Sequence, residues 1–145
     1  MSRKYRFHVL SALIPLLVVV VIAIANGVYP FGNRCLLHID MYHQYCPFYT
    51  EFMYKLKNGA SLMYTWNQGL GTDFVALYAY YLGSPLNVLL FFWPSDYVIE
   101  FMMLATFFKI SGCGLGFYTY LHNHFGLADE EVGYRIMALA FSTAY

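Results

Sequence analysis

The sequence predicts an all-α polytopic membrane protein, and its composition and two long apolar stretches carry that prediction. Hydrophobic residues make up 60% of the chain and charged residues 11%, against roughly 45–50% and about 25% in soluble domains. The aromatic content of 21% excludes a disordered chain. Because the formal net charge is zero, the chain offers no basic surface for nucleic acid.

The first membrane span is predicted at about 8–28. Residues 7–33 include no charged side chain, and their apolar core, Val9–Ala25, has about the length that a bilayer requires. Three basic residues precede this span, so the positive-inside rule places the N-terminus in the cytoplasm: Arg3, Lys4 and Arg6. An alternative is a secretory signal cleaved after Ala23-Ile24-Ala25. Under both interpretations, the segment after Asn26 lies outside the cytoplasm.

A long outer loop follows at about 29–95, and its clearest element is an amphipathic helix. Apolar residues recur there at spacings of three and four. Pro47 is tolerated only in a first turn, so we expect the helix to run from about Cys46 to Asn58-Gly59. Glu51 and Lys55 form an i,i+4 pair on it. We expect this helix to lie in the membrane interface.

The remainder of the outer loop is predicted to be broken. Residues 64–73 contain two glycines and polar side chains, which favours an irregular loop. Two apolar pieces follow, Phe74–Leu82 and Leu86–Trp93, with Ser84 as N-cap and Pro85 at the first helical position of the second. Each is too short to cross a bilayer. They are expected to be interfacial or re-entrant helices.

The second span is predicted at about 96–122, with Ser95-Asp96 as its N-cap. Its three glycines would permit close helix packing: Gly112, Gly114 and Gly116. A polar cytoplasmic turn at 122–131 and a partial third span at 132–145 follow. Because that last run is too short to cross, we expect the chain to be the N-terminal part of a larger polytopic protein.

Asp40 and Lys109 are the charged residues with the strongest functional interpretations. Asp40 follows the first span and precedes the amphipathic helix, where it would be either an N-cap or a general base at the membrane surface. Tyr42 and Tyr45 would partly desolvate the carboxylate and so strengthen it as a base. Lys109 lies within the second span, where it would hold a lipid-linked phosphate or pair with a carboxylate on another helix.

A second group of residues suits the recognition of a sugar. Trp66, Asn67 and Asp73, with Gln68 between them, combine an aromatic face with amide and carboxylate groups, although an interfacial tryptophan is more often an anchor. Gln44 and Tyr45, beside Asp40 in sequence, complete the candidate substrate-binding residues.

The cysteines and histidines give weaker signals. Cys35, Cys46 and Cys113 fit no zinc spacing, although the first two share the outer loop and could pair in an oxidising compartment. His38, Asp40 and His43 permit a divalent metal ion without indicating one. We therefore predict no cofactor.

The chain resembles the N-terminal region of the bacterial YfhO-like membrane proteins. The resemblance is carried in order and spacing by four stretches: Tyr29–Asp40, His43–Phe48, Ser61–Gly71 and Leu77–Asn87. It implies a glycosyltransferase with the GT-C fold that takes a sugar from a polyprenyl-phosphate carrier outside the cytoplasmic membrane. The acceptor would be a cell-envelope polymer such as lipoteichoic acid.

The resemblance also implies roles for particular residues. In that fold class an acidic residue soon after the first span is the catalytic base, and Asp40 occupies this position. Lys109 would face the charge of the lipid phosphate. The chief alternative is a non-catalytic membrane module that binds or helps to translocate a lipid-linked substrate.

Overall fold

The structure is a computed structural model that describes residues 3–125. Its described part is mostly helical, and two helical stretches are long and apolar enough to cross a membrane: Arg6–Ala25 and Ser95–His124. The predicted class of all-α membrane protein is therefore confirmed. The chain divides into two compact units, residues 35–105 and the segments on either side of them. The predicted third span at 132–145 lies outside the described residues.

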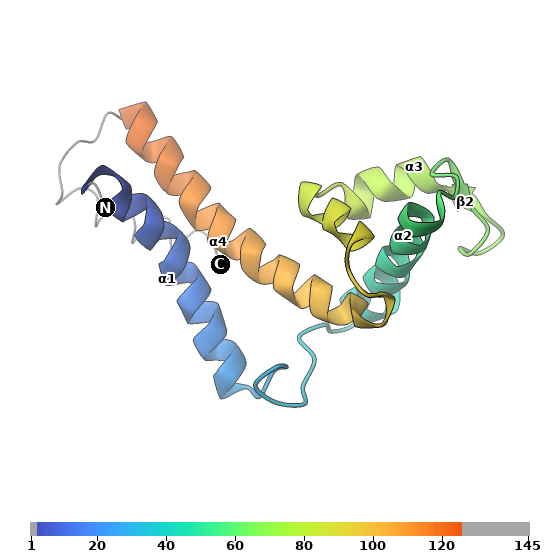
Figure 1. Cartoon of the computed structure of the whole chain (residues 1–145), viewed down its shortest axis with the longest axis horizontal. Helices are drawn as coiled ribbons and strands as arrows, with labels where there is room; N and C mark the ends of the chain where they lie inside the picture. The colour runs from blue at the N-terminus through green and yellow to red at the C-terminus, as the bar shows by residue number, and fades with distance from the viewer. Residues whose placement is uncertain (1–2, 126–145) are drawn as a thin grey trace. The chain divides into compact units, whose positions relative to one another are not determined.

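In the first unit, helix α1 (Arg3–Ala25) packs against the later part of helix α4 (Val98–Phe125) (Figure 1). The two helices approach closely at Gly114, because a Cβ atom built there would lie 2.4 Å from the Ser11 carbonyl oxygen and 2.8 Å from Pro15 Cγ. Pro15 has no backbone N–H, so it cannot donate the usual helical hydrogen bond to Ser11. A glycine opposite this pair lets the two backbones meet.

The predicted role of the glycines in close packing is therefore confirmed for one of the three. A Cβ atom at Gly112 or Gly116 would meet nothing within 4 Å in the described part of the chain. Near Gly114, the Ser111 hydroxyl donates a 2.9 Å hydrogen bond to the Ala12 carbonyl. This bond adds a polar link between α1 and α4.

The second unit is built on helix α2 (Cys46–Asn58), which begins and ends at the predicted residues. Pro47 lies in its first turn, and Gly59 ends it in the left-handed conformation, with φ of 61°. This is a common helix C-terminus, because glycine adopts positive φ without a steric penalty. A π-helical turn, η1 (Met41–Tyr45), leads directly into α2.

The prediction of an irregular loop at 64–73 is wrong at its two ends. Strand β1 (Tyr64–Thr65) pairs antiparallel with strand β2 (Thr72–Asp73). Strands of two residues are too short to show an alternation of apolar and polar side chains, so the pairing leaves no periodic signal. Gly71 adopts φ of 100°, and a Cβ atom there would lie 1.9 Å from the Tyr64 hydroxyl oxygen.

Short helical segments complete the unit: α3 (Phe74–Leu77), η2 (Tyr78–Leu82), η3 (Pro85–Phe91) and η4 (Ser95–Tyr97). The chain bends by 115° between the pieces 74–82 and 85–91. Ser84 and Pro85 occupy the predicted N-cap and first helical positions of η3, although the Ser84 side chain makes no cap hydrogen bond. The predicted cap at Ser95-Asp96 is wrong, because both residues lie inside a 3-10 turn that follows Pro94. In both places a proline initiates the turn by fixing φ, and no side-chain cap is required.

The core of the second unit lies between α2 and the segments that follow it. The apolar face of α2 packs there against α3, η2, η3 and the first turns of α4. Its buried members are Phe48, Tyr49, Phe52, Met53, Phe74, Leu77, Leu82, Leu90, Val98, Phe101, Met102 and Ala105, with Leu37 at the edge. Other parts of the chain therefore cover the apolar face of α2. The location of α2 in the membrane interface stays a prediction.

Candidate functional site

A buried polar network joins α2 to the loop that contains β1. The Glu51 carboxylate accepts a 2.7 Å hydrogen bond from the Thr65 hydroxyl and a 2.6 Å hydrogen bond from the Asn67 side-chain amide. The Asn67 backbone N–H also donates to the Thr65 hydroxyl oxygen at 3.2 Å. The carboxylate therefore fixes the first turn of the loop after β1 and orients the Asn67 side chain.

Lys55 is the buried cation of this network. Its side chain is 7% exposed, and its Nζ lies 3.4 Å from the Glu51 carboxylate. The ammonium also donates hydrogen bonds of 2.8 and 2.9 Å to the carbonyls of Ser61 and Tyr64, and it lies 5.0 Å from the centre of the Phe74 ring. The predicted i,i+4 pair is confirmed. Its burial, and its contacts with the chain between α2 and β1, could not be predicted from the i,i+4 spacing.

Glu51 is held in its ionised form. Burial by itself raises the pKa of Glu51, but hydrogen bonds from Thr65 and Asn67, together with the Lys55 ammonium, bring the pKa below its ordinary value. The network thus places a fixed ion pair at the middle of α2.

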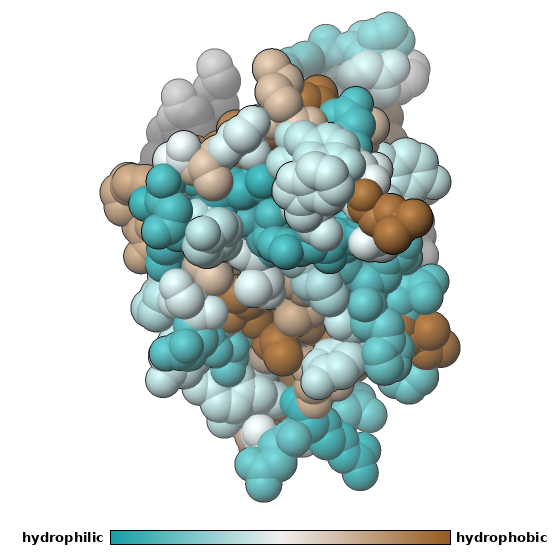
Figure 2. Space-filling view, turned by 90° about the vertical axis from the view of Figure 1, so that its right-hand side faces the viewer, coloured by the Kyte–Doolittle hydropathy of each residue, from teal (hydrophilic) through white to brown (hydrophobic). Residues whose placement is uncertain are grey.

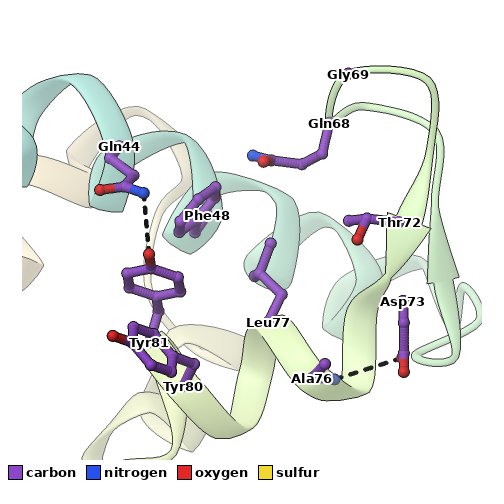
Figure 3. Close-up of a pocket in the computed structure, with 10 residues that line it drawn as sticks. All are labelled: Gln44, Phe48, Gln68, Gly69, Thr72, Asp73, Ala76, Leu77, Tyr80 and Tyr81. Carbon is purple, nitrogen blue, oxygen red and sulfur yellow. Dashed lines mark hydrogen bonds between the residues drawn. The ribbon is translucent and has the colours of Figure 1, made fainter.

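A cavity of about 600 Å³ lies between the start of α2, the loop 68–72 and helix α3. Figure 3 shows Gln68 reaching from the loop toward Phe48, with Tyr80 and Tyr81 below Gln44. The Gln44 amide donates a 3.0 Å hydrogen bond to the Tyr81 hydroxyl, and Tyr80 is 80% exposed. The first cavity therefore combines amide groups with an accessible aromatic ring.

Asp73 also lines the first cavity, but its carboxylate caps α3. It accepts hydrogen bonds from the backbone N–H groups of Val75 at 2.8 Å and Ala76 at 3.4 Å (Figure 3). Such a cap satisfies donors that a helix N-terminus leaves unpaired. The predicted substrate-binding residues Gln44 and Asp73 are thus brought to one cavity, where Asp73 is already engaged by the backbone.

A second cavity of about 500 Å³ lies on the other side of Gln68. Its polar lining includes His43, Glu51 and Asn67, together with Tyr42, Cys46, Thr50 and Gln68. Gln68 lines both cavities. The network around Glu51 therefore forms part of a cavity wall, and the candidate residue Asn67 belongs to this second cavity.

A third cavity, of about 410 Å³, is almost entirely apolar. Its walls come from the end of α2 and from α3, and include Leu56, Phe74 and Val75. Ala76 and Leu77, by contrast, line the first cavity. Helix α3 therefore has a polar cavity on one face and an apolar one on the other.

Asp40 lies immediately before η1 and is exposed. It occupies the N-cap position of η1, as one of the two interpretations predicts, but its side chain makes no cap hydrogen bond. Tyr45 packs edge-on against Tyr81, and Tyr42 packs against His43, so the predicted desolvation by these two tyrosines is wrong.

Ile39, the residue before Asp40, adopts φ of 48°. This left-handed conformation is unfavourable for a β-branched side chain, and strain of this kind is concentrated at functional sites. Its carbonyl accepts the backbone N–H groups of Tyr42 at 3.0 Å and His43 at 2.8 Å. The strained residue thus begins the turn that presents Asp40, and the carboxylate is left free for other chemistry.

Trp66 and Lys109, like Asp40 and Tyr45, line none of these three cavities. Trp66 is 76% exposed and packs edge-on against Tyr64, and the neighbouring Gln68, not Trp66, enters the first cavity. Lys109 is exposed in the α4 segment of the first unit. Its predicted contact with a phosphate remains a prediction.

All three cysteines are free thiols, so Cys35 and Cys46 do not pair. Within residues 3–125, no group of three or more His, Cys, Asp or Glu side chains is placed to hold a metal ion.

Comparison with known families gives a match to the family described as bacterial membrane protein YfhO, over residues 11–145. The chain belongs to the YfhO family. The resemblance seen in the sequence is therefore confirmed, and YfhO membership together with the two apolar helices identifies a membrane protein. Neither the curated proteins nor the solved structures give a significant match.

Several residues of this YfhO-family site were missing from the sequence-based prediction. Glu51 was interpreted only as a helix-surface partner of Lys55, and Tyr80 and Tyr81 only as apolar residues of a short helix. Tyrosines spaced for a helix face give no indication of which rings remain uncovered. The packing of η2 against η1 and α2 shows which rings reach the cavity.

Proposed function

We propose that the protein is a membrane glycosyltransferase that moves a sugar from a polyprenyl-phosphate carrier to a cell-envelope polymer, such as teichoic acid, outside the cytoplasmic membrane. Membership of the YfhO family supports a membrane enzyme of this type. The observation that carries the proposal is the free Asp40 carboxylate at a strained turn, in the same unit as a cavity lined by amides and tyrosines.

Asp40 is the proposed general base. It accepts the proton of an acceptor hydroxyl while the hydroxyl oxygen bonds to the anomeric carbon of the donor sugar. The bond from that carbon to the carrier phosphate oxygen breaks, and the phosphate leaves with the electron pair. Lys109 is the proposed cation that stabilises this departing charge. The exposed Asp40 is accessible to a large acceptor.

The first cavity is the proposed site for the donor sugar. The exposed ring of Tyr80 can stack on the apolar face of a pyranose, and the amides of Gln44 and Gln68 can bond to its hydroxyls. The apolar cavity on the opposite face of α3 offers hydrophobic surface to the carrier chain. A lipid-linked sugar likewise combines a polar sugar with an apolar carrier chain.

The surface of the second unit that Figure 2 shows is compatible with contact with water. Hydrophilic and intermediate residues predominate on the face in Figure 2, and the hydrophobic ones occur in separate groups. We propose that this unit lies on the outer face of the membrane, as the bases before α1 predict.

The test is sugar transfer by the intact protein in membranes, supplied with polyprenyl-phosphate-linked sugars and a teichoic acid acceptor. We expect transfer by the wild type and a loss of donor use by Lys109→Met without a change in membrane abundance. Absence of transfer from every donor by well-inserted protein would favour the non-catalytic lipid-binding module instead.

A further inference from the structure

The second cavity differs from the first in the chemistry of its walls. It contains a fixed carboxylate from Glu51, the amides of Asn67 and Gln68, and the imidazole of His43. Its lining includes neither lysine nor arginine. Such a wall donates and accepts hydrogen bonds but offers no permanent positive charge.

Asn67 is held in position and retains hydrogen-bonding capacity. One N–H of its side-chain amide is used by Glu51, which leaves a second N–H and the carbonyl oxygen for a ligand. Because Glu51 is itself fixed by Thr65 and Lys55, the amide does not have to be ordered when a ligand binds. Preorganisation of this kind lowers the entropic cost of recognition.

The wall of the second cavity offers a phosphate group no unpaired cation. The Lys55 ammonium lies 3.4 Å from the Glu51 carboxylate and balances its charge, and it is buried and also engaged by the carbonyls of Ser61 and Tyr64. The amides of Asn67 and Gln68 in the same wall can bond to neutral hydroxyls. The ligand group that fits is therefore an uncharged polyhydroxyl group.

The π-helical turn that begins directly after Asp40 contributes to both cavities. Tyr42 and His43 on this turn line the second cavity, and Gln44 on the same turn lines the first. The proposed base thus precedes a turn that reaches both cavities, as a mechanism with the donor sugar in one cavity and the acceptor hydroxyl in the other requires.

We propose that this second cavity is the acceptor subsite, and that it takes a neutral, hydroxyl-bearing unit of the acceptor through Asn67, Glu51 and His43. This assignment rests on the proposed glycosyltransferase function. Gln68, which lines both cavities, then contacts donor and acceptor from a single position of the chain.

The experiment is steady-state transfer by the intact protein in lipid nanodiscs, with a polyprenyl-phosphate sugar as donor and poly(glycerol phosphate) as acceptor. Asn67→Ala should raise the KM for the acceptor about tenfold, the equivalent of one lost hydrogen bond, with the donor KM within about twofold of the wild type. Tyr80→Ala should raise the donor KM instead. Asp96→Asn, an exposed acid outside both cavities, is the matched control.

His43→Ala gives a second measurement if Asn67→Ala destabilises the loop. His43 is exposed and lies outside the Glu51 network, so the variant should fold and should also raise only the acceptor KM. Free ribitol should compete with the acceptor, and ribitol 5-phosphate should compete at least several-fold less well. An unchanged acceptor KM in both variants, or stronger competition by the phosphate ester, would overturn the assignment while transfer itself persists. Absence of transfer by the wild type would instead reject the underlying function.

Discussion

The side-chain amide of Asn67 donates a 2.6 Å hydrogen bond to the carboxylate of Glu51, and so joins the loop after β1 to the middle of α2. The same carboxylate accepts a hydrogen bond from Thr65 and pairs with the buried Lys55. One acidic residue thus connects the stability of the second unit to the shape of a cavity wall. Changes in this network should therefore be visible both in folding and in ligand recognition.

Lys55→Met should lower the free energy of unfolding by about 3 kcal/mol, because it leaves Glu51 without its cation and two carbonyls without their donor. Lys57→Met is the matched control on the same helix. Lys57 is exposed and donates to the Trp93 carbonyl and the Ser95 hydroxyl, so its loss should cost about 1 kcal/mol. Chemical unfolding of the purified protein in detergent measures both values. Equal losses in the two variants would contradict a buried role for Lys55.

Glu51 should make the stability depend on pH in the acidic range. Its pKa in the folded state lies below the ordinary value of 4.5, so its contribution is complete above that value and is lost as the pH falls through the folded pKa. The melting temperature of the wild type should therefore decrease between about pH 5 and pH 3. Glu51→Gln should show a shallower decrease, and parallel curves for the two proteins would refute the prediction.

The sequence predicted the elements with strong local signals and missed those set by tertiary contact. Helix α2 begins and ends as predicted because Pro47 and Gly59 determine its ends locally. Both stretches able to span a membrane were predicted because apolar length is a property of composition. The bend between the pieces 74–82 and 85–91 was expected from Gly83-Ser84-Pro85.

The candidate site was predicted less completely, for a physical reason. Gln44, Asn67 and Asp73 do line cavities, because their polar character in an apolar chain was itself informative. Trp66 was the predicted sugar-stacking ring, whereas the tyrosines that line the first cavity are Tyr80 and Tyr81. Which aromatic ring lines a cavity depends on how η2 packs on η1 and α2, and no spacing in the sequence encodes that packing.

Gly71→Ala should distort the loop between β1 and β2. The new Cβ atom would displace the Tyr64 ring, and φ of 100° is strained for any residue with a side chain. We expect a loss of about 2 kcal/mol. Gly59→Ala provides the comparison, because φ there is 61° and the Cβ atom meets nothing within 4 Å, so the cost should be about 1 kcal/mol. Thermal unfolding of both variants measures the two losses of stability. An equal loss would show that the contact with Tyr64 does not contribute to the cost of Gly71→Ala.

Gly114→Ala should weaken the packing of α1 on α4. A Cβ atom 2.4 Å from the Ser11 carbonyl oxygen forces the two backbones apart, at an expected cost of about 2 kcal/mol. Gly116→Ala, two residues further along α4, adds a methyl group to space that is open among the described residues. It should be neutral or slightly stabilising, because alanine favours a helix over glycine by about 1 kcal/mol. Melting temperatures in detergent compare the two, and a milder effect at Gly114 would show that the helices do not meet there.

The central claim is that Asp40 acts as a base and not as a helix cap. The direct measurement is the rate of sugar transfer from a polyprenyl-phosphate donor by membranes that contain equal amounts of the wild type, Asp40→Asn or Asp96→Asn. We predict that Asp40→Asn abolishes transfer with normal membrane abundance and melting temperature, while Asp96→Asn retains it. Persistent transfer in Asp40→Asn would contradict the assignment of the base, and a joint collapse of abundance and transfer would show that Asp40 is structural.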